Sequence, residues 1–158
     1  ELRQFDDIYG RDAPVLAEGS SDLTGSLSEN AAGALTNQDA ITGQIVFSDV
    51  DAGDTPEATT IAANGVLTYT ADGAGSTSPL PAGLMEATIL AAFSIDTAGE
   101  WTYDASAVNL EELGSGDMLS LTFTVTVTDD DGAVDTVPVV LMLSSCRLIW
   151  LTSVKWPG

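Results

Sequence analysis

Leu121-Thr122-Phe123-Thr124-Val125-Thr126-Val127-Thr128-Asp129-Asp130-Asp131-Gly132 is the most regular stretch of this sequence. From 121 to 128, apolar residues alternate strictly with threonine. A period of two places the apolar side chains on one face of a β-strand and the threonines on the other. Three aspartates and a glycine end the pattern, and a second strand-like run follows at residues 134–143. The stretch therefore predicts an antiparallel hairpin with residues 129–132 as its turn.

Shorter runs of the same kind surround this hairpin. They predict strands at residues 24–29, 41–48, 65–70, 87–95 and 100–103, and a turn of helix within residues 107–113. Residues 71–85 are rich in Gly, Ser and Pro, which is typical of a long surface loop. About seven short strands separated by turns predict an all-β antiparallel sandwich.

The length of 158 residues suits one domain with a hydrophobic core. Residues 1–11 show no periodicity, and we interpret them as a leader or linker. Residues 144–158 differ in composition from the rest, with two of the three tryptophans and two of the four basic residues. We interpret them as an atypical tail whose apolar side chains cover a sandwich edge or stay free of it.

The charge balance is strongly acidic, with 24 acidic and 4 basic residues and a net charge of −20. Removing Glu1, Asp6 and Asp7 from the 24 leaves 21 acidic residues between positions 12 and 146, where Lys and Arg are absent. Phosphate contacts need Lys or Arg, so nucleic-acid binding is excluded for this segment, and an anionic membrane surface would repel it. Solvent screening or bound cations must offset the charge.

The residues that are missing exclude several kinds of chemistry. The sequence has no histidine, which removes the usual general base and the commonest zinc ligand. Cys146 is the only cysteine, so an intrachain disulfide is impossible. No run of 18 or more apolar residues occurs, so a membrane-spanning helix is not predicted. We expect a protein that is not an enzyme.

Two acidic turns carry the candidate site. In an up-and-down sandwich of seven strands, the turn after the second strand and the turn after the sixth lie at the same end, with the chain entering nearby. Ca²⁺ takes six to eight oxygen ligands, mostly carboxylates and carbonyls. We therefore predict a calcium site formed by these turns, against the alternative of a solvated acidic surface. Its candidate ligands are Asp49, Asp51, Asp54, Asp129, Asp130 and Asp131, with Asp12 from the entering segment.

Several short motifs occur in a characteristic order. They are Ser28-Glu29-Asn30, residues 43–54 (Gly-Gln-Ile-Val-Phe-Ser-Asp-Val-Asp-Ala-Gly-Asp), residues 98–103 (Ala-Gly-Glu-Trp-Thr-Tyr), residues 113–117 (Leu-Gly-Ser-Gly-Asp) and residues 121–132. Over residues 12–143 this order resembles the VCBS repeat, a cadherin-like module that recurs in tandem in large secreted bacterial adhesins and RTX-type proteins. Residues 11–14 (Arg-Asp-Ala-Pro) resemble the linker between such repeats, with Arg in place of Asn.

The resemblance implies an immunoglobulin/cadherin-like sandwich at the bacterial cell surface whose partners are neighbouring repeats of the same polypeptide. It implies calcium at the domain junctions, held by Asp12, Asp49, Asp51 and Asp130, with Glu29 and Asp104 as candidates at the opposite pole. Residues 71–90 are an insertion relative to the usual repeat. After residue 143 the expected linker sequence is missing.

Three functional hypotheses remain open. The first is a non-catalytic, calcium-binding spacer of an extracellular adhesin. The second is a module that binds a glycan or a protein ligand through residues 71–90 and Trp101. Trp101 and Tyr103 share one face of their strand, which suits core packing and also a sugar-stacking platform. The third is a small hydrolase with paired carboxylates.

Overall fold

Two long strands form the centre of the fold. β9 (Met118–Thr128) and β10 (Val134–Ser144) pair antiparallel along their whole length, which confirms the predicted hairpin. The computed structural model describes residues 12–28, 40–51, 53–60, 64–72 and 74–145. Within them the apolar residues of β9 from Leu119 to Val127 are buried and its threonines lie on the opposite face, as the period of two requires.

The larger sheet forms around this hairpin. β2 (Thr24–Ser28) pairs with β10 on one side. On the other side, β5 (Glu57–Thr59) and β6 (Val66–Thr70) pair with opposite halves of β9. The pairing of β2 with β10 is parallel, so the sheet is not purely antiparallel as predicted.

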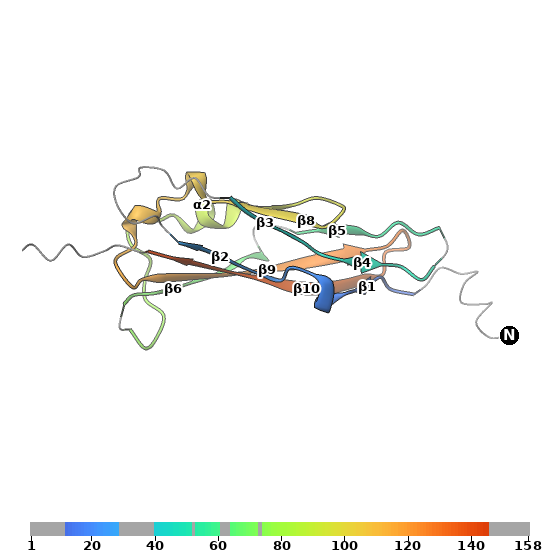
Figure 1. The fold of residues 1–158 in the computed structure, drawn as a ribbon, viewed down its shortest axis with the longest axis horizontal. Helices are drawn as coiled ribbons and strands as arrows, with labels where there is room; N and C mark the ends of the chain where they lie inside the picture. Colours follow the sequence, from blue (N-terminus) through green and yellow to red (C-terminus); the bar gives the residue numbers. More distant parts are fainter. Residues whose placement is uncertain (1–11, 29–39, 52, 61–63, 73, 146–158) are drawn as a thin grey trace, which may run out of the picture.

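A smaller sheet makes the second layer. β8 (Glu100–Asp104) lies between β3 (Ala40–Gln44) and β7 (Phe93–Ile95). β3 and β8 lie above β2, β9 and β10 in Figure 1. A short pair, β1 (Val15–Leu16) with β4 (Phe47–Ser48), extends one end of the molecule. Single turns of 3-10 helix occur at Glu18–Ser20, Ala105–Ala107 and Leu110–Glu112.

The core lies between the two layers. Phe93 of the smaller sheet stacks on Phe123 of the larger one, with ring centroids 4.2 Å apart. Trp101 is 1% exposed, and its indole N–H donates to the backbone carbonyl of Asp22. Gly43 lies so close to the indole ring that a Cβ there would overlap it, which explains why glycine stands at this position. The all-β sandwich is confirmed.

The strand predicted at residues 87–95 is wrong over most of its length. Residues Glu86–Ala91 form the helix α2, and only Phe93–Ile95 is a strand. The helical segment contains Glu, Leu and three alanines within residues 86–92, which are strong helix formers. Ile89 and Leu90 bury one side of this helix against the core. An apolar run of this length fits either structure, so the sequence pattern alone was ambiguous.

The strand predicted at residues 41–48 is divided. The first part, β3, pairs with β8, and the second part, β4, pairs with β1. Between them, Ile45 donates to the carbonyl of Gly99 and Val46 accepts from Ala17, so the chain changes partner here. The strands β1 and β5 were not predicted because each has only two or three residues. The helical turn predicted within residues 107–113 is confirmed as 3-10 turns.

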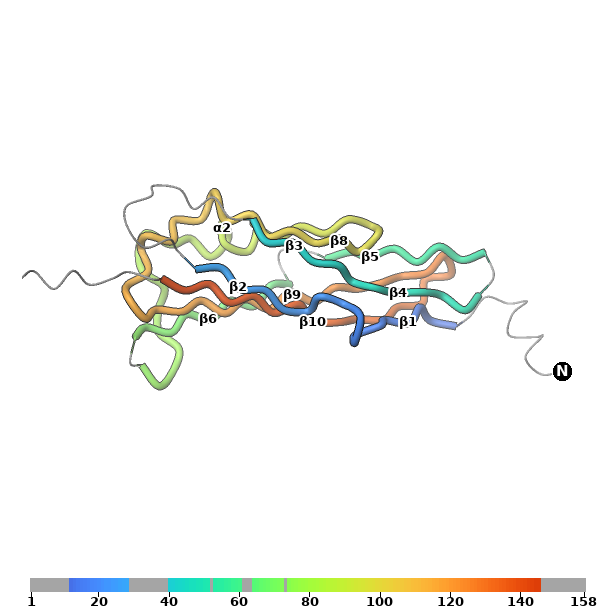
Figure 2. Tube along the Cα trace, in the orientation of Figure 1, coloured from blue at the N-terminus to red at the C-terminus, as the bar shows by residue number. Residues whose placement is uncertain are grey.

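The two ends of the described chain lie at opposite ends of an elongated molecule. In Figure 2 the blue trace before β1 lies at the right, and the red end of β10 lies at the left. The predictions for residues 1–11, Glu29 and residues 147–158 concern positions outside the described residues. Among the described residues, no helix has the length and apolar character to cross a bilayer.

Candidate metal centre

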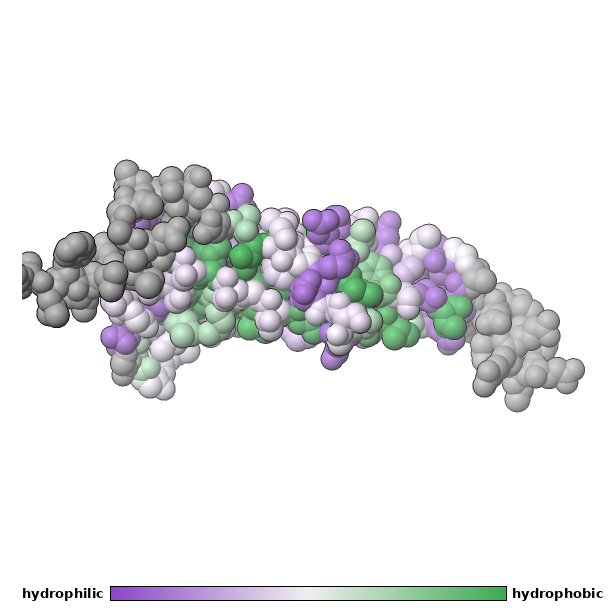
Figure 3. Space-filling view, in the orientation of Figure 1, coloured by the Kyte–Doolittle hydropathy of each residue, from purple (hydrophilic) through white to green (hydrophobic). Residues whose placement is uncertain are grey.

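The two acidic turns lie at the end of the molecule where the chain enters. The first turn, residues 49–54, follows β4. The second, residues 129–132, joins β9 to β10. In Figure 3 some of the hydrophilic residues lie near this end, at the right, and others lie midway along the molecule. The two turns lie together as predicted, although the strands are not purely up-and-down, because β2 runs parallel to β10.

In the first turn, Asp49 stabilises the turn through one carboxylate oxygen. Its Oδ1 accepts the backbone N–H of Asp51 at 2.8 Å, a local bond typical of aspartate in turns. The N–H of Asp54 donates to the carbonyl of Asp51 at 3.4 Å, and Gly53 takes a φ of 109°. This is left-handed backbone that glycine adopts without strain.

The second turn uses Asp129 in the same way. Its Oδ1 accepts the N–H of Asp131 at 2.9 Å and the N–H of Ala133 at 2.8 Å. Gly132 takes a φ of 88° and donates to the carbonyl of Asp129. In both turns the first aspartate therefore binds its own turn with one oxygen and leaves the other oxygen available.

The carboxylates of the two turns converge. Carboxylate oxygens of Asp49, Asp54 and Asp129 lie within 4.8 Å of one another. Oδ2 of each of these residues, and Oδ1 of Asp51, is buried without a hydrogen-bond partner. Asp51 and Asp129 are each only 6% exposed. We call Asp49, Asp51, Asp54 and Asp129 the acidic pole.

The electrostatics of the acidic pole are unfavourable without a cation. Burial raises the pKa of Asp54 above its usual value, and the charges of Asp131, Asp130, Asp49 and Asp51 raise it further. None of the described residues is Lys, Arg or His, so within this part of the chain no side-chain cation compensates the acids. A buried carboxylate oxygen without a partner is costly, and a bound cation removes that cost.

The segment that enters the domain contacts the acidic pole through its backbone. The N–H of Asp12 donates to Oδ2 of Asp51 at 3.0 Å, while the Asp12 side chain is exposed. The sequence predicted proximity of Asp12 to the site, and this contact shows it. The predicted role of the Asp12 carboxylate as a ligand stays a prediction.

Asp130 and Asp131 lie at the rim of the acidic pole. Both are exposed. The carboxylate of Asp130 accepts the hydroxyl of Thr55 at 3.1 and 3.2 Å, which links the two turns directly. The Asp131 backbone N–H holds Asp129 in place. These two residues therefore contribute charge and turn geometry, while the convergent buried oxygens belong to their neighbours.

The candidates for the opposite pole are not brought to this site. Asp104 is exposed at the far end of β8, where its carboxylate accepts the N–H of Ser106 at 2.9 Å. That hydrogen bond lowers the pKa of Asp104. Glu29 lies outside the described residues.

Asp129 and Asp130 are both predicted ligands, and the structure places them differently. The resemblance implied Asp130 as the calcium ligand of this turn. Of the three aspartates at positions 129–131, however, Asp129 is the buried one. The signal was present in the alternation: residues 121, 123, 125 and 127 point inward, and 129 is the next position of that series. Asp49 and Asp51 continue the inward series of Ile45 and Phe47 in the same way.

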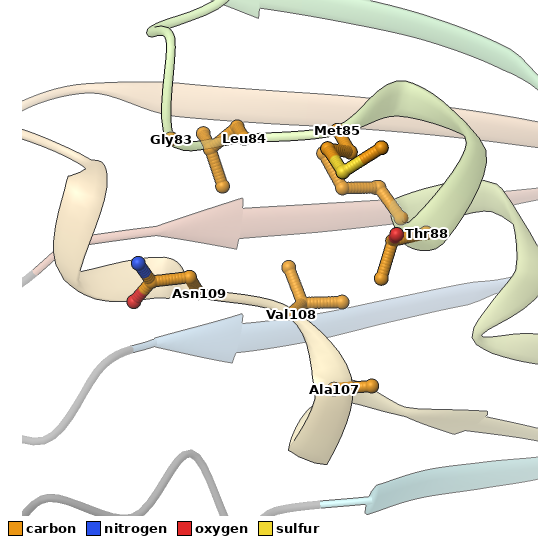
Figure 4. Close-up of a pocket in the computed structure, with 8 residues that line it drawn as sticks. Gly83, Leu84, Met85, Thr88, Ala107, Val108 and Asn109 are labelled. Atoms are coloured by element: carbon orange, nitrogen blue, oxygen red, sulfur yellow. The ribbon is translucent and has the colours of Figure 1, made fainter.

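A small pocket at the opposite end of the sandwich has a different character. It lies between the start of α2 and residues 107–109, which connect the 3-10 turns Ala105–Ala107 and Leu110–Glu112. Leu84, Met85 and Val108 are among its lining residues (Figure 4). No residue that lines it carries a titratable side chain. Trp101, the proposed sugar-stacking residue, is buried in the core and presents no ring to a ligand.

Comparisons with known proteins leave the family of this chain open. No family model matches the sequence, and no curated protein matches it. Seventeen chains among the solved structures match. One is murine CRIg, with 7% identity, a TM-score of 0.36, and coverage of 85% of this chain and 98% of that chain. A likeness this distant gives no information about function.

Proposed function

We propose that this domain is a non-catalytic, calcium-binding structural module of an extracellular bacterial adhesin. In this role it acts as a spacer between neighbouring repeats of the same polypeptide. The ordered motifs of residues 12–143 support the family part of the proposal, through their resemblance to the VCBS repeat.

One observation carries the calcium part. Four carboxylate oxygens of the acidic pole are buried without a partner, and they come from two turns that are far apart in the sequence. A solvated acidic loop would expose these oxygens to water instead. Hydrogen bonds hold Asp49 and Asp129 in place through their other oxygens, so the donors are already arranged.

The chemistry of the donors favours calcium over other metals. All candidate ligands are carboxylate oxygens, which suit hard cations such as Ca²⁺. Zinc and copper sites use nitrogen or sulfur, and the described residues contain neither histidine nor cysteine. A bound calcium ion would supply the positive charge that the acidic pole lacks. Asp49, Asp54 and Asp129 would hold it, with Asp51 beside them.

The shape of the domain supports the spacer role. The described chain enters at the acidic pole and leaves at the opposite end of an elongated sandwich (Figure 2). Copies joined in tandem would therefore extend end to end. The Asp12 N–H bond to Asp51 couples the incoming segment to the residues that would hold the ion.

The alternative of a glycan-binding module loses its main support. It required an exposed ring at Trp101, and this ring is 1% exposed. The loop of residues 71–85 offers no aromatic side chain in its place. The hydrolase hypothesis gains no support from the described pocket of Figure 4, which lacks carboxylates.

A thermal melt tests the proposal. We expect millimolar calcium to raise the melting temperature relative to EDTA, and magnesium at the same concentration to raise it less, because Mg²⁺ dehydrates reluctantly. A ligand at a hundredfold excess over its dissociation constant stabilises the folded state by about 2.7 kcal/mol. Calorimetric titration should give a dissociation constant on the order of 10⁻⁴–10⁻³ M, as in extracellular modules.

The matched variants are Asp49→Asn with Asp129→Asn, and Asp72→Asn as control. Asparagine keeps an oxygen for the turn hydrogen bonds and removes the charge that a cation needs. Asp72 is exposed and belongs to the loop after β6. The double variant should lose most of the calcium response and the control should keep it. A wild-type melting temperature that does not change with calcium would contradict the proposal.

A further inference from the structure

The outer face of the larger sheet carries almost no charge. The strand register places twenty described side chains on this face, none of them buried: nine threonines, four serines, six apolar residues and one acid. We call this set the neutral face. Its members are Thr24, Ser26, Ser28, Glu57, Thr59, Val66, Thr68, Thr70, Met118, Ser120, Thr122, Thr124, Thr126, Thr128, Val134, Thr136, Pro138, Val140, Met142 and Ser144.

This neutrality is unusual in a chain with a net charge of −20. The single acid, Glu57, lies at one end of the face, opposite Thr128. The smaller sheet differs, because both Glu100 and Asp104 lie on its much shorter outer face, beside Thr102. Two copies of the chain would repel each other through most of their surfaces, and the neutral face is where that repulsion is weakest.

The neutral face also collects exposed apolar surface. Half of the eight exposed large apolar side chains of the described residues lie on it: Val66, Met118, Val134 and Met142. The hydroxyls of Thr59 and Thr68 approach backbone carbonyls of β9 at 3.4 and 3.5 Å. These two hydroxyls are thus hydrogen-bonded within the sheet, and the methyl groups of the same threonines are left to contact another molecule.

The footprint of the face approaches the size of a specific interface. β9 has 11 residues. β10 also has 11 residues, β2 and β6 have five each, and β5 has three. At about 3.4 Å per residue and about 4.8 Å between strands, these strands together cover a footprint of about 570 Å². A specific interface buries about 800 Å² on each partner.

We propose that the neutral face is a homotypic docking surface, and that its occupant is the same face of a second copy of this chain. The contact is isologous, so each side chain meets its equivalents across a twofold axis. Threonine and valine side chains of the two sheets pack together as in a sandwich of aligned sheets. The contact lies on a side of the molecule, so it joins copies laterally and needs no calcium.

Sedimentation equilibrium of the full chain tests this inference, from micromolar to millimolar protein, in EDTA and in calcium. The variant is Thr124→Glu, an exposed residue midway along β9, and the matched control is Thr42→Glu, an exposed residue on the outer face of the smaller sheet. We expect a concentration-dependent dimer for wild type and control. Thr124→Glu should weaken it more than about tenfold, because like charges then face each other at the interface.

A mixture of two oppositely charged variants distinguishes a weakened interface from a misfolded variant. Thr124→Lys alone should also weaken the dimer, and mixing the Lys and Glu variants should restore association, which a damaged fold would not do. A wild-type chain that stays monomeric up to millimolar concentration overturns the inference. So does an equal effect of Thr124→Glu and Thr42→Glu. Neither result bears on the calcium proposal, which the melting experiment tests separately.

Discussion

The backbone N–H of Asp12 donates to the carboxylate of Asp51 at 3.0 Å, so the entering chain is bonded to a residue of the acidic pole. The other oxygen of that carboxylate is buried and unpartnered. One side chain thus contacts the incoming segment on one side and the candidate ion site on the other. Any change at the acidic pole should therefore affect the segment that enters the domain at Asp12.

Hydrogen exchange at the Asp12 amide measures this coupling. We expect slow exchange in the wild-type protein with calcium, because the acceptor carboxylate is then held in place. Asp51→Ala removes the acceptor and should accelerate exchange at Asp12. The control is Asp130→Ala, whose carboxylate bonds Thr55 instead. Equal exchange in wild type and Asp51→Ala would show that this bond does not hold the segment.

Asp129 and Asp130 are neighbours in sequence and should differ in function. Asp129→Asn keeps an oxygen for the N–H groups of Asp131 and Ala133 and loses the charge at a buried, unpartnered position. We expect it to weaken calcium binding by at least about tenfold, because a ligand charge is lost. Asp130→Asn should weaken binding less, since Asp130 is exposed and bonded to Thr55. Calorimetric titration of both variants shows which substitution weakens calcium binding more. A larger loss for Asp130→Asn would mean that Asp130 is the ligand.

The pH dependence of the calcium-free protein should report the crowding at Asp54. Burial and neighbouring charges raise its pKa in the folded state above the ordinary 3.8, so the folded state binds the proton more tightly. Stability is therefore lost as the pH rises from 3.8 through the raised pKa. Asp54→Asn should melt higher than wild type in EDTA near neutral pH, and the difference should vanish toward pH 3.8. A difference that is constant with pH would exclude titration of Asp54 as its cause.

The contribution of Asp117 to stability should change with pH in the opposite direction to that of Asp54. Burial alone would raise its pKa, but hydrogen bonds from Tyr69, Asp72 and Gly114 outweigh burial and lower it. The stabilisation of the folded state by the ionised Asp117 is complete above the ordinary pKa of 3.8. It is lost as the pH falls through the lowered pKa of the folded state.

Tyr69→Phe removes the 2.7 Å hydrogen bond to Asp117 and should cost about 1 kcal/mol near neutral pH. Urea unfolding at neutral and at acidic pH checks both statements. The effect of the substitution should shrink in acid. The control is Thr68→Val, the neighbouring strand residue on the outer face. A cost for Tyr69→Phe that is unchanged in acid would mean that the Asp117 charge is not involved.

The fold class follows from local patterns, while the exceptions depend on tertiary contacts. Residues 121–128 of β9 alternate so regularly that only a strand buries their apolar side chains together, whereas residues 137–143 of β10 are a continuous apolar run. Residues 86–91 carry no comparable period, and their structure was decided by the core site that Ile89 and Leu90 occupy. The break between β3 and β4 is likewise set by a change of partner strand, which no local pattern encodes.

The sequence by itself determined the hairpin, the acidic turns and the absence of Lys and Arg between residues 12 and 146, because these depend on the order of residues along the chain. It also contained the inward parity of Asp129, which continues the series of Phe123, Val125 and Val127. Only the tertiary structure decided that Asp49, Asp54 and Asp129 meet, and which oxygen of each remains unpartnered. The physical reason is that a turn fixes its own hydrogen bonds locally, whereas the distance between two turns depends on how the two sheets pack.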